Sequence, residues 1–394
     1  MPNRREFLAQ TAATCVGSGL TSGTLRAVAS EKDVVPNSTR LASTPLRILM
    51  LGGTGFIGPH HVRAALQRGH KISVFNRGRR ATELPSEVEQ LTGDRNSDLE
   101  SIKGRDWDAV IDTATYGPIW VRTLGQALKD RVGHYTFIST VGVYDHPGAN
   151  EDGTDETNKR AEYKGADAYS ITQSQNLSQY GELKALCETE AEKQFPERTL
   201  IVRPGTIVGP NDSGGVFTYW AMRIEAGGEI LVAGDPLSPV QMVDVRDIAE
   251  WVIRMIEIGE TGAFNLVGPA LPLGWAEFLG ALRGLSSSEV SLTWVPVEWV
   301  RKQGISSPLS SVLFWPAEVG FPGIMRMKND KARSKGLTFR PISVTVSDTR
   351  AWFRNQAVDR QKQLLMGLDG TNKALEESMA IERELLAAWH SREN

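Results

Sequence analysis

Two residues four positions apart, Tyr180 and Lys184, form the pair in this sequence best suited to acid–base chemistry. On a helix, residues four apart lie on the same face. A lysine ammonium beside a phenol favours the phenolate, and so lowers the tyrosine pKa from about 10 toward neutrality. Of the seven tyrosines, only Tyr180 has a lysine at the fourth following position. Such a tyrosine would act as a general base that takes the proton of a substrate hydroxyl.

A glycine-rich loop follows an apolar run that ends at residue 51 and precedes a helical pattern. Its glycines have the spacing Gly-x-x-Gly-x-x-Gly. Glycine permits the tight turn and lets backbone N–H groups approach a pyrophosphate at the helix N-terminus. The sequence therefore predicts a dinucleotide site with contacts from Gly52, Gly53, Thr54, Gly55, Phe56, Ile57 and Gly58.

The residues after the second predicted strand, at 71–75, bear on the choice of nucleotide. NAD sites usually place an acidic residue here to hold the ribose 2′-hydroxyl, whereas this chain has Asn76 and then Arg77. A guanidinium can hold a 2′-phosphate instead, so the sequence favours NADP over NAD. The alternative is that the arginine is merely solvated. Asp94, after a short third strand, could bond the adenine or complete an ordinary turn.

Ser139 and Thr140 end the fifth predicted strand, at 134–140. Open α/β sheets place their chemistry at the carboxyl ends of their strands. Either hydroxyl could therefore bond the reacting oxygen. The alternative is that each hydroxyl satisfies its own turn, as Ser and Thr commonly do.

The elements that must position these residues alternate between strands and helices. Apolar runs predict strands and periodic apolar residues predict helices. This alternation predicts an α/β fold, a Rossmann-type doubly wound parallel sheet. The strands are expected at 46–51, 71–75, 91–94, 107–113, 134–140 and 199–203, and the helices at 59–68 and 120–128.

The predicted Rossmann domain covers residues 46–210 and contains a polar insert at 145–179 that is too long for a passive connection. We interpret the insert as a lid, a binding loop or a disordered segment. Residues 211–355 are predicted to form mostly a smaller α+β substrate-binding cap, with part returning to the sheet, and 356–394 a helical tail. The cap tryptophans, interpreted as core residues or as platforms for a sugar ring, are Trp220, Trp294, Trp299 and Trp315.

Residues 1–29 are predicted to be a twin-arginine export signal. Arg4 and Arg5 are followed one residue later by Phe-Leu, then by a weakly apolar stretch and a small-x-small cleavage site. Removing them changes the net charge from −3 to −5 and leaves Cys187 as the single cysteine. The prediction places the mature protein in the periplasm, with the twin-arginine translocase as a transient partner and residues 30–45 as a linker.

The charge balance, 44 basic against 47 acidic residues, disfavours a nucleic-acid-binding surface. No apolar run approaches the roughly 18–20 residues of a membrane span. The histidines have no metal-ligand spacing, so no metal is predicted. The oligomeric state is left open, a dimer included.

Together the glycine loop, the Ser/Thr pair and Tyr180-x-x-x-Lys184 resemble the extended short-chain dehydrogenase/reductase superfamily, in particular its NAD-dependent epimerase/dehydratase group. The resemblance implies that Tyr180 is the base and that Lys184 binds ribose and tunes the tyrosine. It also implies that Thr140 and not Ser139 bears the catalytic hydroxyl, because sugar-nucleotide epimerases of this group place that hydroxyl four residues before a tyrosine, here Tyr144. The predicted cofactor contacts also include Thr113, Ala114, Ser139 and Pro204. Further matching segments are Arg203–Pro210, Gln241–Ala249 and Asn329–Leu337.

The resemblance implies an NAD(P)-dependent enzyme acting on a secondary alcohol or keto group of a sugar-like substrate. Export would separate the enzyme from a free nicotinamide pool, so the cofactor is expected to stay bound and to be recycled in each turnover. One alternative is a simple NADPH-dependent reductase. The glycine loop and the Phe-Asn-Arg-Gly strand end also resemble a branch that includes chloroplast stem-loop-binding proteins, so a second alternative is a dinucleotide-binding scaffold or RNA-binding protein.

Overall fold

The computed structural model describes residues 41–79, 84–113, 116–145, 153–171, 179–305, 312 and 322–392. The predicted export signal and most of the linker lie outside these residues, as do Ala114, Trp315 and parts of the insert at 145–179.

The centre of the fold is a seven-stranded sheet in the order β10-β6-β5-β4-β1-β2-β3. Every neighbouring pair is parallel. The order reverses between β1 and β4, the switch point at which doubly wound sheets bind ligands. The strands are β1 (Arg47–Leu51), β2 (Lys71–Asn76), β3 (Glu89–Thr92), β4 (Trp107–Asp112), β5 (Val132–Ile138), β6 (Thr199–Pro204) and β10 (Gly262–Leu266).

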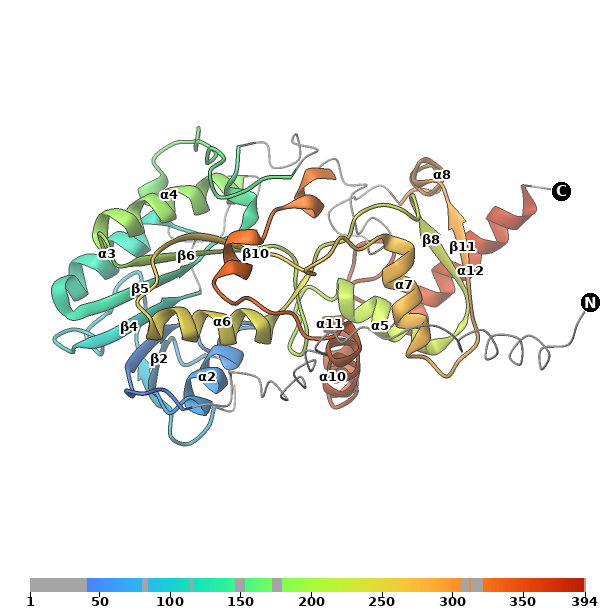
Figure 1. Cartoon of the computed structure of the whole chain (residues 1–394). Coiled ribbons are helices and arrows are strands. Elements are labelled where there is room, and N and C mark those ends of the chain that lie inside the picture. The colour runs from blue at the N-terminus through green and yellow to red at the C-terminus, as the bar shows by residue number, and fades with distance from the viewer. Residues whose placement is uncertain are drawn as a thin grey trace, which may run out of the picture. The chain divides into compact units, whose positions relative to one another are not determined.

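Helices cover both faces of this sheet (Figure 1). α2 (Gly58–Gln67) and α6 (Val245–Glu257) pack on one face, and α3 (Pro118–Leu128) and α4 (Tyr180–Gln194) on the other. Alternate residues of β1 supply the two cores, because successive strand side chains point to opposite faces. Ile48 and Met50 join the first core, and Leu49 and Leu51 the second. The predicted Rossmann-type doubly wound fold is confirmed.

The strand β10 lies at the edge of the main sheet. β10 pairs with β6, so the chain comes back to the sheet after leaving it at residue 204. The amphipathic helix α6 precedes β10 and provides the connection, with the Asp244 carboxylate accepting a hydrogen bond from the Arg246 amide at its first turn.

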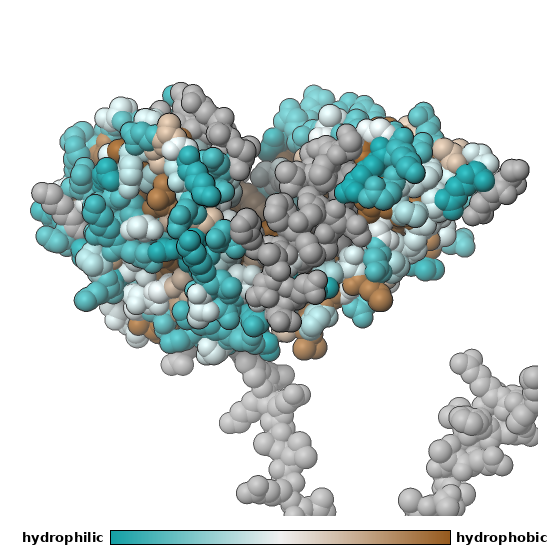
Figure 2. Space-filling view, turned by 90° about the horizontal axis from the view of Figure 1, so that it is seen from above, coloured by the Kyte–Doolittle hydropathy of each residue, from teal (hydrophilic) through white to brown (hydrophobic). Residues whose placement is uncertain are grey.

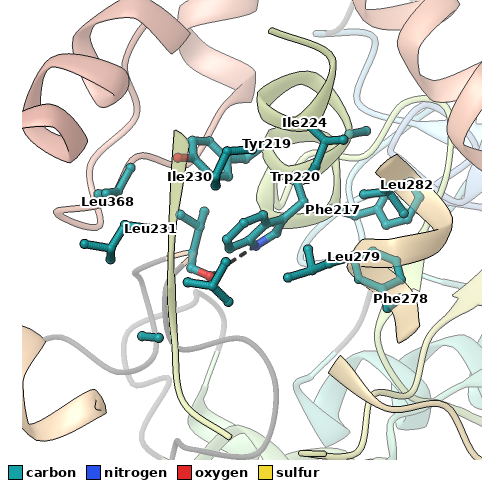
Figure 3. Packing of buried hydrophobic residues seen from close by; sticks show 14 of the residues in the cluster. Phe217, Tyr219, Trp220, Ile224, Ile230, Leu231, Phe278, Leu279, Leu282 and Leu368 are labelled. Carbon is teal, nitrogen blue, oxygen red and sulfur yellow. Dashed lines mark hydrogen bonds between the residues drawn. The ribbon is translucent and has the colours of Figure 1, made fainter. Parts of the chain in front are cut away.

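A second hydrophobic core is built mainly from residues after 207. Trp220 is fully buried within it, and its indole N–H donates to the Val312 carbonyl at 3.2 Å (Figure 3). Trp294 and Trp299 are half-buried against the same core, so these described tryptophans are packing residues. The elements here are α5 (Val216–Ala226), β8 (Gly228–Ala233), α7 (Trp275–Gly284), β11 (Val290–Val295), α8 (Val297–Lys302), α10 (Ile342–Arg354), α11 (Val358–Leu364) and α12 (Leu375–Ser391).

The remaining elements are short. β7 pairs with β9 next to the main sheet, and β8 pairs with β11 in parallel. The bounds are β7 (Ile207–Val208), β9 (Val243–Asp244), α9 (Asp330–Ser334), and the 3₁₀ turns η2 (Lys129–Arg131), η3 (Val141–Val143), η4 (Ala168–Ser170) and η8 (Pro322–Arg326).

The described surface in Figure 2 is mainly hydrophilic, with apolar residues scattered over it. None of the helices described has both the length and the apolar composition needed to cross a bilayer.

Asp212, in the loop between β7 and α5, makes the fold sensitive to pH. Its carboxylate is buried and accepts hydrogen bonds from the Gly214 amide at 2.8 Å and the Thr218 hydroxyl at 3.3 Å. Burial raises the Asp212 pKa to about 6. Because the pKa of Asp212 is higher in the native than in the unfolded state, protonated Asp212 stabilises the fold at low pH. This stabilisation is lost as the pH rises through about 6.

Replacing Asp212 with asparagine should remove this dependence while keeping an amide oxygen as acceptor. Between about pH 5 and pH 8, the free energy of unfolding of the wild type should fall by about 1 kcal/mol relative to that of Asp212→Asn. Urea denaturation at the two pH values measures the difference. Parallel pH profiles for the two proteins would contradict the expectation.

Candidate functional site

The residues predicted to act on a nucleotide or substrate follow the carboxyl ends of parallel strands. The glycine loop follows β1, Thr113 follows β4, and Ser139 and Thr140 follow β5. Since all these strands are parallel, these residues lie along one edge of the sheet. Asn76 ends β2, Asp94 lies two residues after β3, and Pro204 ends β6, so they belong to the same edge.

The glycine loop has no space for larger side chains at two positions. A Cβ atom on Gly58 would lie 2.4 Å from the Gly53 carbonyl carbon, and one on Gly53 would lie 2.7 Å from the Val74 side chain. Gly52 has a φ of 87°, in the left-handed region that favours glycine. The loop therefore folds tightly onto the first turn of α2.

The N-terminus of α2 is suited to an anion. Ile57 is its N-cap, no side chain caps the helix, and the first turn contains no acidic residue. The loop residues Gly52, Thr54, Gly55, Phe56 and Ile57 are partly exposed. Backbone N–H groups at such a terminus attract phosphate, so the cradle fits the pyrophosphate of a dinucleotide.

The residues after β2 and β3 are partly engaged in their own turns. The Asn76 amide oxygen accepts from the Gly78 amide at 2.6 Å. The Asp94 carboxylate accepts from the Asn96 amide at 2.9 Å, which is the ordinary turn considered as the alternative for this residue. Arg77 is exposed beside Asn76. Of these three side chains, Arg77 is the one turned toward solvent.

Thr113 ties the end of β4 to the glycine loop. Its hydroxyl donates to the Leu51 carbonyl at 2.9 Å. The preceding residue, Asp112, is fully buried and accepts two hydrogen bonds from Arg95, at 2.6 and 2.7 Å, and one from the Tyr135 hydroxyl at 2.9 Å. We did not predict this buried ion pair, although a carboxylate at the end of an apolar strand was a sequence signal for it.

Thr140 and Tyr180 are brought together by a close backbone approach. Tyr180 begins α4, and a Cβ on the next residue, Gly181, would lie 2.0 Å from the carbonyl oxygen of Gly142 in η3. Thr140 is the N-cap of η3, where its hydroxyl accepts from the Gly142 amide at 3.1 Å. The Tyr180 side chain is 38% exposed. The predicted hydroxyl and base therefore stand at the same end of α4.

Lys184 lies one turn further along α4 and is buried. Its ammonium donates to the Ile138 carbonyl at 2.5 Å and lies 4.2 Å from the centre of the Phe137 ring. Burial lowers the Lys184 pKa to about 8. Desolvation of the phenol raises the Tyr180 pKa, which corrects the expected lowering, because the charged phenolate is disfavoured away from water.

Ser139, predicted as a cofactor contact, is buried and bonded elsewhere. Its hydroxyl donates to the Glu188 carboxylate at 2.5 Å. Glu188 also pairs with Arg203, and Arg203 in turn donates to the Tyr144 hydroxyl at 2.9 Å. Glu188 was missed by our sequence analysis, yet its position four residues after Lys184 extends the face that carries Tyr180 and Lys184.

The described part of the polar insert, residues 153–171, is attached to the site edge by specific contacts. Arg160 bonds Glu188 and Glu192 on α4, and the Glu156 carboxylate accepts from the Asn265 amide of β10. The Tyr169 ring stacks on Arg122 of α3 at 3.5 Å. Residues 153–171 therefore form a strap that contacts α3, α4 and β10.

Gly181 offers a direct test of the Thr140–Tyr180 arrangement. Gly181→Ala should force α4 away from η3, lowering the free energy of unfolding by about 1–3 kcal/mol and impairing turnover. Thermal denaturation and steady-state assays measure the two effects. Gly284→Ala is the matched control, because a Cβ there meets nothing within 4 Å. Equal behaviour of the two variants would contradict the close approach.

Across the described ranges, no group of three or more His, Cys, Asp or Glu side chains is arranged to hold a metal ion.

Comparisons with known proteins identify the family of this fold. The model of the NAD dependent epimerase/dehydratase family matches residues 48–266, more than half of the chain. The match begins in β1 and ends with β10, so it spans the whole main sheet and every predicted catalytic residue.

Two curated relatives differ in their described activities. The chain is 26% identical to the chloroplast stem-loop binding protein of 41 kDa b from Arabidopsis thaliana, over 58% of this chain and 60% of that protein. It is 25% identical to dTDP-4-dehydro-6-deoxy-D-allose reductase from Streptomyces bikiniensis, over 56% of this chain and 76% of that protein. The chain thus matches less than two thirds of the length of the first relative.

Solved structures share the fold at lower identity. UDP-glucose 4-epimerase from Thermotoga maritima, with UDP-glucose, has a TM-score of 0.56 at 17% identity, covering 78% of this chain and 99% of that one. UDP-glucuronic acid 4-epimerase from Bacillus cereus, in complex with NAD, has a TM-score of 0.55 at 16% identity, covering 79% and 99%.

Proposed function

Because the chain belongs to the NAD dependent epimerase/dehydratase family, we propose that it is an NAD(P)-dependent enzyme acting on a secondary alcohol or keto group of a sugar-nucleotide-like substrate. The observation that carries this proposal is the close approach of Gly181, next to Tyr180, to Gly142 in the turn that Thr140 caps, at the sheet edge that also holds the glycine loop. The sugar nucleotides named for the Streptomyces reductase and for the two epimerases support the substrate class.

The residues take separate roles in this proposal. The loop from Gly52 to Gly58 binds the pyrophosphate, and the bound nucleotide supplies the hydride acceptor. Tyr180 takes the proton of the substrate hydroxyl, while the Thr140 hydroxyl steadies the oxygen that becomes negative. From the family resemblance, Lys184 is assigned the nucleotide ribose, and its positive charge would favour the tyrosinate.

We further propose that the nucleotide stays bound and is recycled. This follows from the predicted export signal, since a periplasmic enzyme would have no free nicotinamide pool to exchange with. The strap 153–171, which bonds α4 through Arg160, supports a closed site.

Mass spectrometry of the purified exported protein tests the proposal. We expect about one NAD(P) per chain, and turnover of one or more members of a panel of UDP- and dTDP-hexoses into an epimer, a dehydrated product or a reduced sugar. Protein that contains no nucleotide and binds none at micromolar concentration would overturn it.

Arg77 is the proposed selector for NADP. Its exposed guanidinium stands beside Asn76 at the end of β2, and a charge-assisted bond to a 2′-phosphate contributes about 1.5–3 kcal/mol. Arg77→Ala should therefore raise the Kd for NADPH by about tenfold or more and leave that for NADH unchanged. Fluorescence titration measures both. Arg105→Ala, an exposed arginine paired with Glu89, is the control, and an equal change for both nucleotides would contradict NADP selection.

The match to a stem-loop binding protein favours one second candidate, a dinucleotide-binding protein that contacts RNA. The acidic net charge of −3 argues against it. Filter binding to a structured RNA at two salt concentrations distinguishes the candidates: saturable binding without sugar-nucleotide turnover would favour the scaffold.

A further inference from the structure

One face of α4 contacts the end of β5 and the turn η3 that follows it, at successive turns of the helix. Gly181 meets the Gly142 carbonyl at the first turn, and Lys184 bonds the Ile138 carbonyl at the second. At the third turn, Glu188 accepts from the Ser139 hydroxyl at 2.5 Å. Ser139 directly precedes Thr140, so the residue that bears the proposed catalytic hydroxyl is held from both sides.

Glu188 is the most heavily engaged of these groups. It is fully buried, and besides Ser139 it accepts from Arg203 Nε at 3.0 Å, Arg203 Nη2 at 2.7 Å and Arg160 Nη1 at 3.3 Å. A buried carboxylate is stable only when its lone pairs are filled in this way. The arrangement therefore has one well-defined geometry, set by the directions of these donors.

The network extends beyond Glu188 to β6, which neighbours β5, and to β10 at the edge of the sheet. Arg203, in β6, donates to the Tyr144 hydroxyl at 2.9 Å, and Tyr144 donates to Asn265 of β10 at 2.6 Å. Tyr144 directly follows η3, whose N-cap is Thr140. Both ends of the segment 139–144 are consequently tied to the Glu188–Arg203 pair.

We propose that Glu188 is a positioning residue: by holding Ser139 and Arg203 it sets the separation between the Thr140 hydroxyl and the Tyr180 phenol. Tyr180, Lys184 and Glu188 lie at intervals of four on α4, so a single helix face carries the base, its ammonium and their anchor. This inference rests on the proposed function, since the separation matters only if the two groups act on one bound substrate. A misplacement of about 1 Å in such a site can lower the rate by about 10²-fold.

NADH fluorescence tests the proposal without knowledge of the substrate. The dihydronicotinamide ring would lie beside Thr140 and Tyr180, so its emission reports how well that end of the site is ordered. We would compare the Kd for NADH and the fluorescence lifetime of bound NADH in the full chain for Glu188→Gln and Ser139→Ala.

Ser139→Ala removes a single hydroxyl and leaves the Glu188–Arg203 pair intact, so it serves even where Glu188→Gln fails to fold. Glu192→Gln is the matched control, because Glu192 lies on the same helix and bonds Arg160 but is exposed.

The expected result is a lifetime of bound NADH that differs from wild type in both variants, with a Kd close to that of wild type. Glu192→Gln should match wild type in both measurements. A purely structural role would lower the melting temperature and leave the lifetime unchanged, and that result would overturn the proposal. Failure of wild-type protein to bind NADH or NADPH at all is a different result, because it would overturn the proposed function itself.

Discussion

Replacing Tyr180 with phenylalanine should lower turnover by about 10²–10⁴-fold, the usual contribution of a positioned general base. The substitution removes only the hydroxyl of a side chain that is 38% exposed at the start of α4. Stability should therefore change little, and the Kd for the nucleotide should stay within about threefold of wild type. Steady-state kinetics on a sugar nucleotide that the wild type converts, together with nucleotide titration, measures the two effects separately.

Tyr169→Phe is the control for this experiment. Tyr169 bonds Glu190, which lies almost three turns further along α4 than Tyr180, and stacks on Arg122. Its loss should leave turnover close to wild type. If Tyr180→Phe were as active as Tyr169→Phe, Tyr180 would not be the base, and a protein that keeps nucleotide but shows no turnover in any form would favour the scaffold candidate.

Replacing Gly58 with alanine should abolish nucleotide binding at micromolar concentrations. The new methyl group would lie 2.4 to 2.6 Å from the backbone carbon, Cα and oxygen of Gly53, and backbone atoms cannot move aside cheaply. The first turn of α2 must then shift away from the loop that would hold the pyrophosphate. We expect a Kd raised by about 10²-fold or more and a free energy of unfolding lowered by about 1–3 kcal/mol.

Gly280→Ala is the opposite case and the control for Gly58→Ala. Gly280 lies within α7, and a Cβ there meets nothing within 4 Å. Alanine in a helix interior should stabilise the protein by about 0.5–1 kcal/mol. Calorimetry and nucleotide titration of both variants make the comparison. A Gly58→Ala protein that binds nucleotide like wild type would show that the loop does not cradle it.

Local sequence patterns determined the main sheet. The apolar run before Gly52 could be read as a buried strand because both faces of β1 are covered by helices, so every side chain from Ile48 to Leu51 is apolar. The same reasoning located β2, β4, β5 and β6 to within about two residues. The four-residue spacing of Tyr180 and Lys184 placed both on one face of a helix, although the bounds of α4 were not predicted.

The contacts and pKa shifts of the site residues depend on which partner each side chain meets, and tertiary structure decides that partner. Adjacent hydroxyls at 139 and 140 have the same chemistry in the sequence, but the pleat of the strand end turns Ser139 toward Glu188 and leaves Thr140 at η3. The direction of the Tyr180 pKa shift depended on burial, which no spacing of residues reports. Similarly, the sequence predicted that part of residues 211–355 returns to the sheet, but the pairing of β10 with β6 is set by tertiary packing.

The sequence by itself thus determined the strands, the nucleotide-binding loop and the face of α4 that carries Tyr180 and Lys184, because these depend on periodicity and on contacts between near neighbours in the chain. Only the tertiary structure decided that Glu188 and Arg203, fifteen residues apart, close a buried pair around Ser139. The physical reason is that a buried charge must find its counter-charge wherever the fold brings one within reach. That partner comes from packing of α4 against β6 and has no signature in local spacing.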